Sequence, residues 1–94
     1  MFRESPPVAG RVRKPLGGAE AGFRGRIDSI DAAGGSSGLA PEELERRLIE
    51  LGFVEGAAVE ILHEGIIGHD PIAVRVDNST VALRRREAMS ILVI

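Results

Sequence analysis

Hydrophobic and polar residues alternate most regularly along the stretch from Pro71 to Leu83. One side of this stretch carries its large aliphatic residues: Ile72, Val74, Val76, Val81 and Leu83. A period of two predicts strands with one buried face. The turn formers at positions 77–80 divide the stretch, so we expect an antiparallel hairpin with Val76 opposite Val81 and Val74 opposite Leu83. Because a lone hairpin is only marginally stable in water, further strands must cover its apolar face.

A helical period occupies Pro41 to Leu51, and it is the one clear helix in the sequence. Three leucines recur at the i, i+4, i+7 spacing of an amphipathic helix: Leu44, Leu48 and Leu51. Pro41 suits the first helical position, and Gly52 suits the left-handed conformation that ends a helix. We expect Phe53 to fold back onto Leu48 in a Schellman ending.

The remaining elements are short. We expect a first strand at 23–30, with a bend or bulge at Gly25, and a second strand at 57–63, in which Leu62 breaks the alternation. At most one helical turn fits in 84–89, and a final strand follows at 90–94. The sequence therefore predicts a mainly β domain: a small, closed or nearly closed barrel of about five strands, with the helix at about 41–51 between the first two.

Composition restricts the functional classes. The 94 residues carry a net charge of −2, three phenylalanines as the only aromatic residues and no cysteine. This balance favours neither nucleic acid nor membrane, and it excludes disulfides and thiolate metal sites. No apolar segment is long enough to span a bilayer or to act as a secretory signal, so we expect a soluble cytoplasmic protein without membrane insertion. We expect residues 1–14 to be a disordered basic tail and residues 15–94 to form the domain.

One cluster resembles a set of metal ligands: His63, Glu64, His69 and Asp70. Imidazole and carboxylate groups suit divalent transition metals, so weak binding of Fe(II) or Zn(II) is one hypothesis, although no cofactor is required. An ordinary polar loop explains the same residues, and His63 shares the parity of Ile61, which would place it at the mouth of the barrel. No serine lies in a nucleophile elbow, and no carboxylates pair in a pocket, so we expect no enzymatic activity.

Two features predict contact with a partner. Ile66 and Ile67 are adjacent large aliphatics in a loop flanked by glycines, where a core role is hard to assign to both. Either one packs down while the other is exposed, or both form a contact patch. The run of cations Arg84, Arg85 and Arg86 could bind an acidic group, or it could form a solvated turn beside a strand.

Several segments together resemble the FeoA family, the small cytoplasmic proteins of bacterial ferrous iron uptake. The segments that carry the resemblance are Gly22–Ile30, Leu48–Gly56, Val59–Leu62, Gly68–Val76 and Val81–Val93. The likeness runs in order from Pro15 to Ile94. Two positions depart from the family pattern, since proline is frequent where this chain has Ile66 and His69 intervenes between Gly68 and Asp70.

The resemblance implies an SH3-like barrel and a non-catalytic accessory role toward FeoB, the membrane protein that carries Fe(II) and has a cytosolic G domain. The docking surface we expect on this chain comprises Ile66, Ile67, His69, Asp70, Arg75, Arg84, Arg85 and Arg86. It would meet the G domain or a membrane-proximal surface of FeoB.

Alternatives remain open at this stage. The related barrel of iron-dependent repressors suggests a metal-responsive interaction domain that acts on a transcription regulator. A nucleic-acid-binding barrel would need a basic stripe with aromatic rings, which this near-neutral chain lacks. Exposed strand edges would also allow a homodimer.

Overall fold

The computed structural model describes residues 12–32 and 38–94. Its elements follow one another in the order β1 (Lys14–Pro15), the 3-10 turn η2 (Leu16–Gly18), β2 (Arg24–Ile30), α1 (Pro41–Glu50), β3 (Ala58–Glu64), β4 (Ile72–Val76), β5 (Ser79–Leu83), α2 (Arg85–Ala88) and β6 (Ile91–Val93). Helix α1 lies between β2 and β3, as the sequence predicts. None of the helices in the described segments is long and apolar enough to cross a bilayer. Lys14, the last residue of the predicted tail, lies in β1; residues 1–11 of that tail lie outside the described residues.

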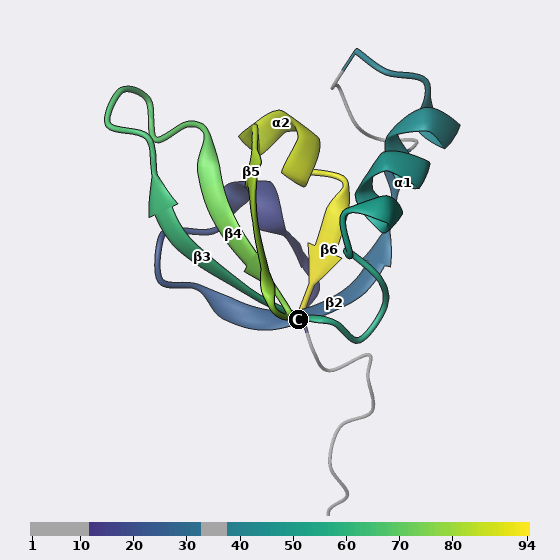
Figure 1. Cartoon of the computed structure of the whole chain (residues 1–94), viewed down its shortest axis with the longest axis horizontal. Helices are drawn as coiled ribbons and strands as arrows, with labels where there is room; N and C mark the ends of the chain where they lie inside the picture. The colour runs from purple at the N-terminus through teal and green to yellow at the C-terminus, as the bar shows by residue number, and fades with distance from the viewer. Residues whose placement is uncertain (1–11, 33–37) are drawn as a thin grey trace, which may run out of the picture.

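All six strands form one antiparallel sheet in the order β1-β6-β2-β3-β4-β5 (Figure 1). The sheet curls around its core, but among the described residues no strand ladder joins β1 to β5, so of the closed or nearly closed barrel that the sequence predicts, the structure has the open form. Contact between η2 and α2 bridges the two edges instead, and Gly17 lies so close to the Arg85 carbonyl that a side chain there would clash. The sixth strand, β1, was missed because two residues are too short to show alternation. Dimer formation through the strand edges stays a prediction.

The β4–β5 hairpin forms as expected, but its register differs by two residues. Val74 pairs with Val81 and Val76 with Ser79, instead of Val74 with Leu83 and Val76 with Val81. The chain reverses earlier, over Asp77 and Asn78, because Asp77 adopts a positive φ of 50° that permits a two-residue turn. A shift of two keeps every side chain on its face, so the predicted apolar face is retained.

Strand β2 is bent where it changes partners. Residues 24–26 pair with β3, and residues 27–30 pair with β6. The register shift lies between Ile27 and Ser29, not at Gly25 as the sequence suggested. Gly25 is needed for a different reason: a side chain there would collide with the Ile94 carbonyl. The bend lets one strand serve both halves of the curled sheet.

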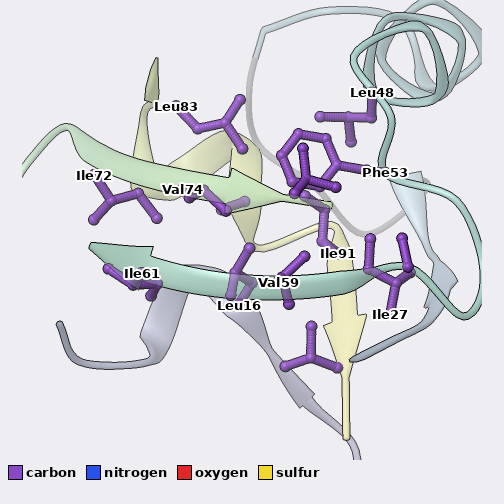
Figure 2. Close-up of a cluster of buried hydrophobic side chains, with 14 of the residues drawn as sticks. Leu16, Ile27, Leu48, Phe53, Val59, Ile61, Ile72, Val74, Leu83 and Ile91 are labelled. Atoms are coloured by element: carbon purple, nitrogen blue, oxygen red, sulfur yellow. The ribbon is translucent and has the colours of Figure 1, made fainter. Parts of the chain in front are cut away.

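Helix α1 covers the core with the predicted leucines. Leu44 and Leu48 are buried, and Leu51 caps the helix. Gly52 has φ 107°, and the Phe53 amide donates to the Leu48 carbonyl at 3.0 Å, so the Schellman ending is confirmed. Figure 2 shows Leu48 and Phe53 pointing into the same apolar cluster as the side chains of β2, β3, β4 and β6.

Candidate functional site around the β3–β4 loop

The loop from 65 to 71 joins β3 to β4 and projects beyond the sheet, at the upper left of Figure 1. Gly68 and His69 both have positive φ, 72° and 58°, and the Asp70–Pro71 peptide bond is cis. The Gly65 amide donates to the Pro71 carbonyl at 2.9 Å, which closes the base of the loop. Gly65 has no room for a side chain because the Asp70 carbonyl lies against it.

A β-bulge at Leu62 decides which polar side chains reach this end of the sheet. Ile61 pairs with Val74, but His63 pairs with Ala73 and Glu64 with Ile72, so one extra residue sits in β3. Simple alternation would place His63 on the inner face with Ile61. The bulge instead places Glu64 on the face of the buried Ile72 and leaves His63 exposed. The expected location of His63 at the barrel mouth is therefore wrong, and Glu64 takes that place.

The side chain of Arg85 holds the site together. Its guanidinium donates to Glu64 Oε1 at 2.7 Å and to the His69 carbonyl at 2.7 Å. It also donates to the carbonyls of Gly17 and Ala19, at 3.0 and 2.6 Å. These are charge-assisted bonds because their donor is a cation. Only one-fifth of the Arg85 side chain is exposed, so they lie in a partly desolvated position. Arg85 therefore ties η2, the β3–β4 loop and α2 to one another.

Two further bonds fix the loop against α2. Asp70 Oδ1 accepts a hydrogen bond from the Arg85 amide at 2.9 Å, which satisfies a free N–H at the start of α2. His69 Nδ1 lies 2.9 Å from Glu64 Oε2, on the far side of the carboxylate from Arg85. Asp70 and Glu64 are thus used inside the protein rather than offered to a partner.

The loop and the η2 segment border an open cleft of about 640 Å³. Its wall is made by the small residues of positions 17–19 and 21, and its polar lining by Glu20, Glu64, His69 and Arg85. The Glu64 carboxylate meets the Arg85 guanidinium directly, so their two charges offset each other.

Ile66 and Ile67 lie at the tip of the loop and are 98% and 88% exposed. Neither packs down, so of the two readings of this pair the structure leaves only the one with both residues in solvent. Adjacent fully exposed isoleucines on a loop held in a fixed conformation form a small apolar surface.

The predicted arginines have different surroundings. Arg84 and Arg86 are exposed on either side of Arg85, at the loop end of the molecule. Arg75 is exposed too, but it pairs with Thr80 near the hairpin turn, toward the other end of β4 from the loop. The bonds of Arg85 to the His69 carbonyl and to Asp70 thus bring the Arg84–Arg86 turn to one end of the loop that carries Ile66 and Ile67.

The four proposed metal ligands are not assembled into a centre. Within residues 12–32 and 38–94, no group of three His, Asp or Glu side chains is arranged to hold an ion. Glu64 and His69 do meet, but Arg85 already neutralises Glu64, and His63 points elsewhere. A dedicated metal site does not fit these residues, and weak binding of Fe(II) or Zn(II) stays a prediction.

Sequence reasoning missed the structural role of Arg85. In the run Arg84–Arg86 the three residues look equivalent, and a helical turn of known phase would be needed to tell the inward one from its neighbours. One signal could have indicated a buried cation: Glu64 directly follows a predicted strand whose alternation fails at Leu62.

Comparisons with known proteins agree with this architecture. A family model of the FeoA domain matches residues 14–94. The crystal structure of Stenotrophomonas maltophilia FeoA complexed with zinc, described as a prokaryotic SH3 domain protein, shares 30% identity with a TM-score of 0.70, over 85% of this chain and 88% of that one. The Chlorobium tepidum FeoA protein shares 32% identity with a TM-score of 0.66, over 84% and 67% of the two chains.

A more distant likeness concerns the fold alone. A manganese-dependent transcriptional repressor shares 22% identity with a TM-score of 0.68, over 95% of this chain and 47% of the repressor. A search of curated protein sequences found no match. The expected SH3-like class is confirmed, and so is the likeness in fold to a metal-dependent repressor.

Proposed function

The chain belongs to the FeoA family, and from this premise we propose that it serves ferrous iron transport as a non-catalytic accessory protein that docks on the cytosolic part of FeoB. The docking surface is formed by Ile66 and Ile67, with His69, Arg84 and Arg86 beside them. The observation that carries this proposal is the near-complete exposure of two adjacent isoleucines, 98% and 88%.

The energetics favour a protein partner for this tip. Full burial of one isoleucine side chain is worth about 1.5–3 kcal/mol, so the pair offers a gross gain of about 3–6 kcal/mol on contact. The loop loses little freedom on binding, because Arg85 and Asp70 already hold it against α2. A preformed apolar tip of this kind suits a shallow apolar pocket on the partner.

The flanking charges add steering. Arg84 and Arg86 are exposed, whereas Glu64, Asp70 and Glu87 accept hydrogen bonds inside the protein. These two cations favour a partner pocket with an acidic border and raise the association rate at low salt.

The experiment is a pull-down of the cytosolic G domain of FeoB by the Ile67→Asp variant and by the Ile66→Asp, Ile67→Asp double variant. We expect the fold to be kept, because both side chains are already in solvent, and binding to fall at least tenfold. Val12→Asp is the matched control, since Val12 is 80% exposed and lies outside the loop. Undiminished binding by the double variant would move the docking site elsewhere.

A second candidate is a metal-responsive interaction domain that acts on a transcription regulator, which the fold shared with manganese-dependent repressors favours. Binding to a regulator that depends on iron, with no affinity for FeoB, would support it. Binding to FeoB that is independent of added metal would count against it.

The metal hypothesis has its own test. We expect Fe(II) or Zn(II) to bind weakly, and the His63→Ala, His69→Ala double variant to bind less tightly in a calorimetric titration. His69 is the imidazole nearest a carboxylate, 2.9 Å from Glu64. An unchanged affinity in the double variant would remove these residues as ligands.

A further inference from the structure

A second cleft, of about 270 Å³, lies between β2 and α1, and it shares no lining residue with the cleft at the β3–β4 loop. Its floor is apolar, formed in part by Ile49, Phe53 and Val54. Ile49 and Val54 are 46% and 43% exposed, an unusual position for large aliphatics so close to the core. In Figure 1, α1 lies on the opposite side of the molecule from the β3–β4 loop.

The rim of this cleft is acidic. It carries Asp28 from β2, Glu45 from α1 and Glu55 from the turn that precedes β3. Asp28 is bound by Arg13, with Nη1 of the arginine 3.2 Å from Oδ2 of the aspartate. Glu45 and Glu55 have no ion-pair partner in the part of the chain that the structure describes.

Arg13 links this rim to a basic segment of the same chain. The eleven residues before Val12 include Arg3 and Arg11 against the single acid Glu4, and their one aromatic residue is Phe2. The arm thus has positive charges that complement the acidic rim and an aromatic side chain that suits the apolar floor, and its junction with the domain already pairs with the rim through Arg13. Arg3 lies ten positions before Arg13, a reach of up to ~33 Å in extended chain.

We infer that the N-terminal arm, residues 1–11, docks in the cleft between β2 and α1. Phe2 lies on the floor of Ile49 and Val54, and Arg3 lies between the carboxylates of Glu45 and Glu55. The arm covers the apolar floor and neutralises the free acids of the rim. This surface is distinct from the proposed docking loop, so either proposal can fail alone.

Attachment makes even a weak contact sufficient. A short flexible tether gives an effective concentration on the order of 1 mM. An intrinsic dissociation constant of ~0.1 mM would then keep the arm bound in about 90% of molecules. A basic segment of another protein would need a much higher affinity to reach the same occupancy at cellular concentrations.

The test uses the full chain with one introduced cysteine, Ser5→Cys, which takes a nitroxide spin label at a single position because the chain has no other cysteine. We expect the amide NMR signals of Ile49, Val54 and Glu55 to lose more than half of their intensity. The signals of Ile66 and Ile67 should keep theirs. Addition of 0.5 M salt should restore most of the lost intensity.

Two double variants separate a specific contact from general charge attraction. Glu45→Lys, Glu55→Lys should abolish the broadening. Glu43→Lys, Glu50→Lys makes the same change in net charge at exposed positions of α1 outside the cleft, and it should retain the broadening. Unbroadened cleft signals in the labelled chain, or an equal loss of broadening in both double variants, would overturn the inference.

Discussion

The Arg85→Ala substitution tests whether one side chain holds the site together. It removes the ion pair with Glu64 and the bonds to the carbonyls of His69, Gly17 and Ala19. The carbonyls border an open cleft, so water can replace part of each bond, and we take about 0.5–1 kcal/mol for each of the three. The partly exposed ion pair adds about 1 kcal/mol. The free energy of unfolding should therefore fall by about 2.5–4 kcal/mol.

The assay is chemical and thermal unfolding of the variant beside the parent chain. A loss of this size in a domain of this length lowers Tm by about 10–30 °C. Amide hydrogen exchange should show that the protection of Gly65, whose amide closes the loop at 2.9 Å, falls more than that of the core strands. Arg86→Ala is the matched control, because Arg86 is an exposed neighbour in the same helical turn and should change stability by less than about 0.5 kcal/mol.

Arg85→Lys separates charge from geometry. A lysine ammonium can keep the attraction to Glu64, but it cannot reach three carbonyls on two other segments at once. We expect it to recover no more than about half of the lost stability. Full recovery by lysine, or an Arg85→Ala variant within 0.5 kcal/mol of the parent, would refute the role given to the guanidinium fork.

Two stability predictions follow from single buried groups. Ser90 is 1% exposed, and its hydroxyl has no hydrogen-bond partner within residues 12–32 and 38–94. Ser90→Ala should therefore raise the free energy of unfolding by up to about 1 kcal/mol in urea titration, and a loss of more than about 0.5 kcal/mol would mean that the hydroxyl is bonded after all. Phe53 is fully buried under the end of α1, so Phe53→Ala should lower the free energy of unfolding by about 3–5 kcal/mol. Val54→Ala, at a half-exposed neighbour, should lower it by less than about 1 kcal/mol. Equal losses in the two variants would show that the Phe53 site collapses or was never well packed.

The elements that sequence alone predicted are those with a strong local signal. Helix α1 has three leucines in phase, proline at its start and glycine after its end, so its bounds came within one residue of the observed Pro41–Glu50. The β4–β5 face was also correct, because alternation fixes parity. Parity does not fix register, however, and the turn position depended on the positive φ of Asp77, which composition does not reveal.

The candidate site was predicted only in part, because its geometry is set by long-range contacts. The exposure of Ile66 and Ile67 could be expected from their glycine-flanked loop. The positions of His63 and Glu64 could not, because the bulge at Leu62 exchanges their faces and becomes visible only in the pairing with β4. The inward turn of Arg85 depends on carbonyls 66 and 68 residues earlier in the chain, beyond the reach of any local pattern.

That distance along the chain has a consequence for synthesis. A ribosome synthesises residues 64–71 before Arg85, so the nascent chain carries the two isoleucines before the guanidinium can hold their loop against the rest of the domain. Only after Arg85 has left the ribosome can its guanidinium bind the carbonyls of Gly17, Ala19 and His69 together. A partner that recognises the clasped shape would therefore distinguish mature molecules from fragments still being made.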